Sequence, residues 1–330
     1  MANDFLPFGT GAGANVLDQA AYDALPARLA GFSSGTAKSI ELNKVWRQSS
    51  FIASVLAQFI ADATGEDVLD DGDSAGLEAK LRRAIAGYVA TPVGASADAA
   101  MSLPSAAASA TFSASQVCVG TSIGGSRFLL SNYSQSLNLT TTGAGGMDTG
   151  SAPTNGFVAI YAIYNPLTGT RSILAANATA AVAPEVYAGG NMPAGYTASA
   201  LISVWGTNAS GQLVIGTQVG RRIGFTDSVV LNTSTVQGTP TAITVPAIPR
   251  NAKTAGGSLI ISAAVSGNLQ LFVYDSDSNT GQRAIVVSST GLRASFDGVC
   301  IKTPQTIRWS SANSGATSQN FQILLSNYTF

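Results

Sequence analysis

One segment, residues 39–64, constrains the fold of this chain more than any other. It reads SIELNKVWRQSSFIASVLAQFIADAT. Apolar or small side chains recur in alternating steps of three and four residues, as the a and d positions of a heptad pattern do. The spacing predicts one long amphipathic helix with Ser39 as its N-cap and Gly65 as the glycine that ends it. The seam on this helix comprises Leu42, Val45, Ser49, Ile52, Leu56 and Phe59.

Two interpretations of the seam remain open at this point. In the first, the helix is an ordinary amphipathic helix that packs on a small core of its own chain. In the second, several identical chains bury their seams against one another in a bundle. A second helical pattern at residues 74–90 follows an acidic turn, so the two helices form a hairpin. One hairpin covers only part of so wide an apolar stripe, and we therefore predict a trimeric bundle.

Charge divides the chain into two regions. Only 11% of all residues are charged, against about 25% in typical soluble domains. Residues 1–116 hold seven Lys and Arg against twelve Asp and Glu, a net charge of −5, and residues 117–330 hold ten against six, a net charge of +4. The whole chain, at −1, has no strong attraction for nucleic acid or for an anionic membrane. No run approaches the ~20 apolar residues of a membrane span, and no signal peptide is recognisable, which predicts synthesis in the cytoplasm.

The pattern changes period after the helices. Residues 91–116 are mostly Ala, Ser and Thr, which predicts a linker. Beyond it, short runs rich in Val, Ile, Thr and aromatic residues alternate with turn signals, as in antiparallel sandwiches and jelly rolls. We therefore expect an α+β multidomain protein: a helical region at 1–90, the linker, and two antiparallel, jelly-roll-like β-sandwiches at 117–225 and 226–330.

Catalysis finds little support in this sequence. Histidine is absent, which removes the Ser–His and Cys–His nucleophile pairs and the usual zinc sites. Cys118 and Cys300 do not form a disulfide framework, and whether they are bridged stays open. The acidic turn at 66–73 lacks the ligand spacing of an EF-hand loop. We predict no catalytic residue, metal site or cofactor; a carboxylate pair for glycan cleavage that includes Glu185 is the weaker alternative.

Binding is the better-supported class of function. Turn-rich loops on rigid sandwiches are where binding residues concentrate, and a net +4 attracts anionic polysaccharide at low salt. Trp205 and Trp309 are able to stack on sugars, although core packing suits them better. The candidate glycan contacts lie in the loop at 185–196 and at the hairpin tip at 275–281. They are Glu185, Tyr187, Asn191, Tyr196, Asp275 and Asp277.

Two stretches resemble a known family. The first is LPFGTGAGANVLDQAAYDAL followed by GFSSGTAKSIELNKVWRQSSFIASVLAQFIADATGEDVLDDGD, within residues 1–85. It looks like the N-terminal region of tail-fibre and collar-fibre proteins of tailed bacteriophages. The second, NGFVAIYAIYNP … NATAAVAPEVYAGGNMPAGYTASALISVWGTN at residues 155–208, resembles β domains of the same proteins.

The resemblance implies a homotrimer in the virion. Its N-terminal part would attach to other virion proteins of the tail, baseplate or neck, and its β part would project outward. The apolar start, with Phe5, Leu6 and Phe8, is the candidate docking segment. Two roles stay open for the distal part: contact with bacterial surface polysaccharide, or a collar, neck or baseplate decoration that binds no receptor.

Overall fold

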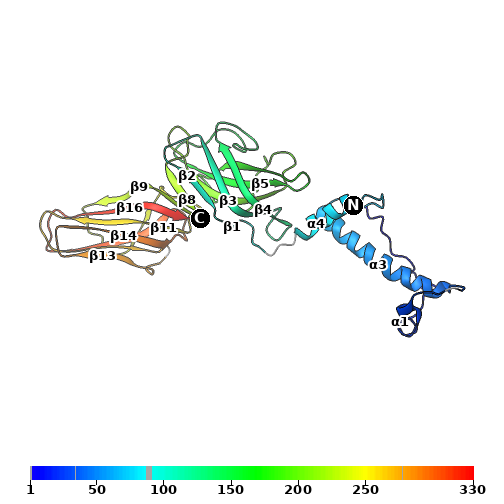
Figure 1. The fold of residues 1–330 in the computed structure, drawn as a ribbon. Helices are drawn as coiled ribbons and strands as arrows, with labels where there is room; N and C mark the ends of the chain where they lie inside the picture. The colour runs from blue at the N-terminus through cyan, green and yellow to red at the C-terminus, as the bar shows by residue number, and fades with distance from the viewer. Residues whose placement is uncertain (1, 34, 87–90, 277) are drawn as a thin grey trace. The chain divides into compact units, whose positions relative to one another are not determined.

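The computed structural model describes residues 2–33, 35–86, 91–276 and 278–330. Over these residues the chain is mostly β, with N-terminal helices and two antiparallel sheets (Figure 1). It divides into two compact units, Met1–Ala90 and Thr91–Phe330, which we call the helical unit and the β unit. Each is described separately.

The helical unit is built around one long helix. Its four helices are α1 (Gln19–Asp23), α2 (Ala27–Ala30), α3 (Ser39–Thr64) and α4 (Ser74–Ala86). Helix α3 has the bounds that its heptad spacing predicts, and Gly65 ends it in the left-handed conformation with φ 76°. The N-cap is Lys38 rather than Ser39, whose hydroxyl accepts a hydrogen bond from Asn15 instead. Of the second predicted helix, residues 87–90 lie outside the described residues.

A small core holds α3 to α4 and to the N-terminal strand-like segment. Its buried members come from α3, α4 and the connection between them; they are Ala57, Ile60, Ala61, Val68 and Ala84. Phe5 packs against this core, and an isolated parallel bridge pairs Asn3 with Val68. Phe5 is therefore partly used inside its own chain, whereas Leu6 and Phe8, the other two residues of the predicted docking segment, are exposed.

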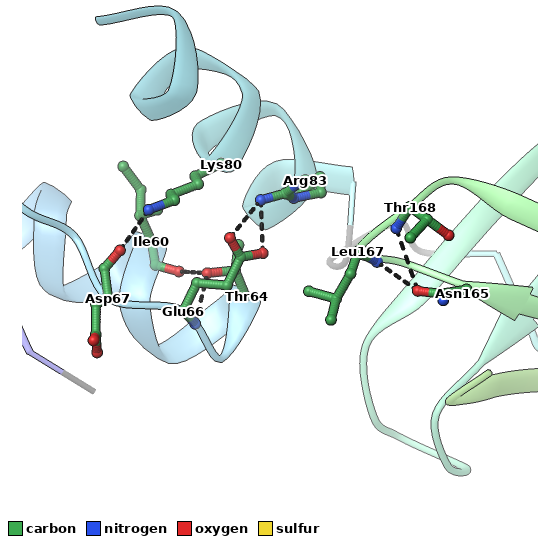
Figure 2. Close-up of polar contacts among 9 residues, drawn as sticks. All are labelled: Ile60, Thr64, Glu66, Asp67, Lys80, Arg83, Asn165, Leu167 and Thr168. Atoms are coloured by element: carbon green, nitrogen blue, oxygen red, sulfur yellow. Dashed lines mark hydrogen bonds and ion pairs between the residues drawn. The ribbon is translucent and has the colours of Figure 1, made fainter. Parts of the chain in front are cut away.

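The acidic turn between α3 and α4 has a structural role. Glu66 accepts two hydrogen bonds from Nη2 of Arg83, at 2.6 and 2.8 Å, and the backbone carbonyl of Asp67 accepts from Nζ of Lys80 at 2.6 Å (Figure 2). Asp73 accepts from the amide of Gly76 at 2.9 Å, as a cap at the start of α4 does. The carboxylates of Glu66 and Asp73 therefore stabilise the helical hairpin.

The β unit contains sixteen strands among its described residues. They are β1 (Ser96–Ala97), β2 (Ala100–Leu103), β3 (Ser109–Gly120), β4 (Arg127–Asn138), β5 (Phe157–Asn165), β6 (Thr170–Asn177), β7 (Ala198–Gly206), β8 (Gly216–Val219), β9 (Arg222–Thr233), β10 (Thr241–Thr244), β11 (Thr254–Ser262), β12 (Asn268–Tyr274), β13 (Arg283–Val287), β14 (Gly291–Cys300), β15 (Thr306–Ser314) and β16 (Asn320–Thr329).

Two sheets contain these strands. The larger has the order β14-β11-β16-β9-β8-β2-β3-β7-β5-β6, with β1 and β4 also paired to β3, and the smaller has the order β10-β15-β12-β13. Strands β12 and β13 of the smaller sheet lie against β11 and β14 of the larger one.

A side chain within the turn stabilises the hairpin between β5 and β6. At the β5–β6 hairpin, the side-chain oxygen of Asn165 accepts from the amides of Leu167 and Thr168, at 3.0 and 3.3 Å (Figure 2).

The prediction of a linker at residues 91–116 is wrong. This segment contains β1, β2 and the first half of β3, and it buries Met101, Leu103 and Phe112 in the main core. Its many Ala and Ser residues alternate along strands, where small side chains fit between neighbours on the sheet. Amino-acid composition predicted a flexible linker because it contains no information on which residues pair with a neighbouring strand.

The boundary predicted between two sandwiches at residues 225 and 226 is also wrong. Strand β9 runs across it and pairs with β8 on one side and β16 on the other (Figure 1). One hydrophobic core includes residues from Ala99 to Phe330. The hydroxyl of Tyr328, in the last strand, donates to the carbonyl of Val204 in β7 at 2.6 Å. Residues 91–330 therefore form one body.

A repeated pentapeptide, LLSNY, performs the same task twice. It occurs at residues 129–133 in β4 and at 324–328 in β16. In both copies the tyrosine is buried and its hydroxyl donates to a distant backbone carbonyl at 2.6 Å, Tyr133 to Ser172 and Tyr328 to Val204. Each copy thereby secures a strand to the core through a satisfied polar group.

These two tyrosines predict a loss of stability at alkaline pH. Burial raises the pKa of Tyr133 and of Tyr328 well above the usual 10.0, so both stay protonated in the native protein. In the unfolded chain they ionise above pH 10. Their contribution is therefore present below pH 10 and is lost above it, by about 3 kcal/mol per pH unit for the pair. Urea unfolding at pH 9 and pH 11 measures the slope, and the double variant with Tyr133→Phe and Tyr328→Phe should lose that part of it.

Candidate functional site

The described residues contain no group of three or more His, Cys, Asp or Glu side chains placed to hold a metal ion. Among those same residues, no helix has the length and apolarity to cross a membrane. Cys118 and Cys300 are both free thiols. The predicted loops and one hollow of the β unit are the candidates for a functional site.

In the loop at residues 185–196, two of the four predicted glycan contacts form bonds with other side chains of the same protein. Glu185 pairs with Arg221 at 2.8 Å. Tyr187 donates its hydroxyl to Asp148 at 2.8 Å, and its ring meets that of Tyr161 edge-on at 5.4 Å. Burial, and after it the hydrogen bond to Asp148, raise the pKa of Tyr187 to about 12. These groups stabilise the loop and have little left to offer a ligand.

The other two predicted contacts in this loop are more open. Asn191 is exposed, and with the described residues it forms one hydrogen bond, from its backbone amide to the hydroxyl of Tyr187 at 3.3 Å. Tyr196 is half-buried, packed on the main core. The loop thus presents Asn191 and one edge of Tyr196 to solvent.

The hairpin tip at 275–281 is also internally bonded. Asp275 is half-buried, and its Oδ1 accepts from the amide of Cys300 at 3.1 Å. A side chain at Gly281, where φ is 62°, would meet both carboxylate oxygens of Asp275 at 2.5 Å. Asp277 lies outside the described residues. Within the described part of the chain, no hydrogen bond or ion pair joins this tip to the loop at 185–196.

A cleft of about 590 Å³ opens elsewhere on the β unit. Its walls come from the start of β5, the end of β7, the approach to β8, the first half of β9, the loop after β10 and the end of β16. The predicted sandwich boundary passes through this cleft, because β5 and β7 precede residue 225 and β16 follows it. The cleft exists only because the two halves form one body.

The floor of the cleft is aromatic and rigid. Trp205 is 1% exposed, and its indole N–H donates to the carbonyl of Val214 at 2.9 Å. The ring of Phe225 lies 5.8 Å from that of Tyr328, whose hydroxyl is held by Val204. Trp205 is thus a core residue, as the sequence favours, and it lines the cleft as well. Trp309, 7% exposed, is a core residue without that second role.

The rim of the cleft is polar. Among the described residues that line it, Asp227 alone is charged, and its Oδ2 accepts from Nη2 of Arg293 at 2.5 Å. The same nitrogen of Arg293 also donates to the hydroxyl of Ser258 at 3.1 Å. Asn155, Thr226 and Ser228 line the cleft, and their side chains form no hydrogen bond with other described residues. An aromatic floor below unengaged hydroxyl and amide groups suits a small ligand with one apolar face and polar edges.

Sequence reasoning missed this site. Its residues come from segments up to about two hundred positions apart, and no sequence motif for ligand binding marks them. One local signal was present: Thr226, Asp227 and Ser228 form a polar run directly after Phe225, inside a strand. The predicted boundary between the two sandwiches falls directly before that run.

Neither a protein-family model nor a curated protein matches this chain. Two solved structures show distant structural similarity. One is TmCBM61 in complex with β-1,4-galactotriose, at 12% identity over 35% of this chain and 63% of that one, with a TM-score of 0.19. The other is a Bacillus thuringiensis Cry1Da tryptic core variant, at 7% identity over 76% of this chain and 54% of that one, with a TM-score of 0.19. Each match spans less than two thirds of the other chain, and likeness at this level carries no statement about function.

Proposed function

We propose that this chain is the subunit of a homotrimeric fibre or spike in the virion of a tailed bacteriophage. The helical unit joins the subunits and attaches them to other virion proteins of the tail, baseplate or neck. The β unit, with its two sheets packed as in a jelly-roll-like sandwich, projects outward and contacts glycan on the host surface. The chain carries out no catalysis in this proposal and uses no cofactor. The resemblance of residues 1–85 and 155–208 to phage fibre proteins supports it.

The observation that carries the proposal is the open seam on α3. Ile52 is 68% exposed and Leu56 is 45% exposed, whereas the face of α3 that packs in its own chain holds Ala57, Ile60 and Ala61. Ser49 is exposed, and its hydroxyl is satisfied by the carbonyl of Val45 at 3.1 Å, so burial would leave it no unpaired donor. Leu42, Val45 and Phe59 are half-buried. Burying Ile52 and Leu56 in a bundle would gain about 1–2 kcal/mol for each side chain.

The oligomeric state is the direct test. Multi-angle light scattering of the full-length protein should give three times the chain mass of 33.4 kDa. A monomer at micromolar concentration would refute the bundle. Electron microscopy of virions labelled with an antibody to the β unit then locates the protein on the particle.

Attachment should depend on the exposed part of the docking segment. Leu6 is 73% exposed, and Phe8 packs edge-on against Trp46 at 6.0 Å while both rings stay about half exposed. Leu6→Asp places a charge on this apolar surface without touching the small core, so the trimer should persist while virions lose the protein. Immunoblots of purified particles measure the loss. A matched control is Leu29→Asp, an exposed leucine in α2, which should be incorporated normally.

The rival role is a collar, neck or baseplate decoration without receptor binding. Saturable binding of the purified trimer to host cells, in competition with phage adsorption, supports the fibre that contacts the host. Absence of binding together with labelling at the neck supports the decoration.

A further inference from the structure

We propose that the cleft between β7, β9 and β16 binds an uncharged sugar unit of a glycan. This inference rests on the proposed role of the β unit in glycan contact. It places the glycan contact in the cleft and not in the loops at 185–196 and 275–281. It also expects a neutral ligand, whereas the net charge of the β region suggests an anionic one.

The size and floor of the cleft fit a sugar ring. Its volume of about 590 Å³ lies in the range of small-ligand sites, about 300–1,000 Å³. Phe225 is half-buried and lines the cleft together with Phe157 and Trp205. The C–H face of a pyranose packs on aromatic rings of this kind, which are large, apolar and rigid. Because Trp205 and Tyr328 are already hydrogen-bonded to backbone carbonyls, the floor needs no rearrangement to receive it.

The rim supplies partners for sugar hydroxyls. Asn155 offers an amide donor and acceptor, and Thr226 and Ser228 each offer a hydroxyl, all without partners among the described residues. A lipid chain or another wholly apolar ligand would cover these groups without satisfying them, at the full desolvation cost of each. A ligand with hydroxyl groups around an apolar face matches both the floor and the rim.

Charge then selects among glycans. Asp227 is the one charged side chain among the described residues that line the cleft. Its Oδ2 is held by Arg293, and Oδ1 accepts no hydrogen bond from a described residue, so it is available to a sugar hydroxyl. Because Arg293 balances the charge of Asp227, this part of the cleft carries no net charge that would attract a uronate or sialate carboxylate. The site therefore favours neutral sugars, although residues 117–330 carry a net charge of +4.

Titration of the intact protein with oligosaccharides tests the inference. The probes are a panel of neutral hexose oligosaccharides and the matched uronate-containing oligosaccharides, measured by calorimetry. Asp227→Asn removes the charge-assisted acceptor and releases Arg293, so affinity for the neutral ligand should fall tenfold or more while uronate binding appears. Phe225→Ala should abolish neutral binding. Asn191→Ala, in the loop predicted from sequence, is the control and should bind as the parent does.

The outcomes distinguish failure of the cleft inference from failure of the proposed glycan contact by the β unit. Neutral binding that is lost in Asp227→Asn and retained in Asn191→Ala supports the cleft. Because Asp227 is exposed, its variant should fold, and a thermal melt confirms this for both cleft variants. If either cleft variant binds glycan as tightly as the parent protein does, the cleft inference is overturned and glycan contact stands. The same holds if the parent protein prefers uronate-containing oligosaccharides. If the protein binds neither the panel nor host cells, glycan contact itself fails, and the cleft proposal with it.

Discussion

Replacement of both Ile52 and Leu56 by aspartate is expected to convert the proposed trimer into monomers. The two side chains are the most exposed members of the apolar seam on α3, and they lie four residues apart on one face of the helix. Three seams in a bundle would bring six new carboxylates into a closed apolar interface, where each charge costs several kcal/mol of desolvation. Light scattering should give a mass near 33.4 kDa in place of three times that value.

The matched control is Phe51→Asp. Phe51 is 50% exposed on the same helix, and at 100° per residue it projects well away from the seam. This variant should remain a trimer, and circular dichroism should show the same helix content in both proteins. Dissociation by Phe51→Asp to the same extent would mean that general loss of apolar surface, and not the seam, governs assembly.

Phe321→Ala is expected to destabilise the whole β unit at once. Phe321 is fully buried in β16, between β9 and β11, and removal of a buried phenylalanine ring costs about 3–5 kcal/mol. For a unit of this size that lowers the melting temperature by roughly 10 °C. Because residues 91–330 share one core, strands far from the substitution should lose stability too. Hydrogen exchange followed by mass spectrometry should show β5 and β11 losing protection together.

The control for Phe321→Ala is an exposed valine of the same unit. Val286→Ala, at an exposed position of β13, should change stability by no more than about 0.5 kcal/mol. If Phe321→Ala exposes β11 while β5 keeps the protection of the parent, the halves unfold independently. That result would restore the two separate sandwiches expected from the sequence.

The helical unit was the more predictable part. Bounds for α3 follow from the heptad spacing and from Gly65, and the pair of Glu78 and Arg82 forms as its i,i+4 spacing predicts, at 2.6 Å. These features depend on neighbours within one or two helical turns. The N-cap was assigned one residue late because Ser39 bonds to Asn15, a residue outside the helix.

The candidate site was the less predictable part. Exposed aromatic and acidic residues in turn-rich loops looked like ligand contacts, yet Tyr187 bonds to Asp148 and Glu185 pairs with Arg221. These partners lie 39 and 36 positions away. No local pattern distinguishes a loop tyrosine that faces a ligand from one that is hydrogen-bonded to a distant carboxylate.

By itself, the sequence determined the elements whose causes are local. It specified one long helix with an apolar seam, a second helix, and a following region of antiparallel strands, since side-chain period and turn residues act within a few positions. Only the tertiary structure decided that residues 91–116 are strands, that β9 joins the two halves, and that the cleft lies where they meet. The physical reason is that strand pairing and core packing join residues more than a hundred positions apart, such as Tyr328 and Val204, and neighbours along the chain carry no record of such partners.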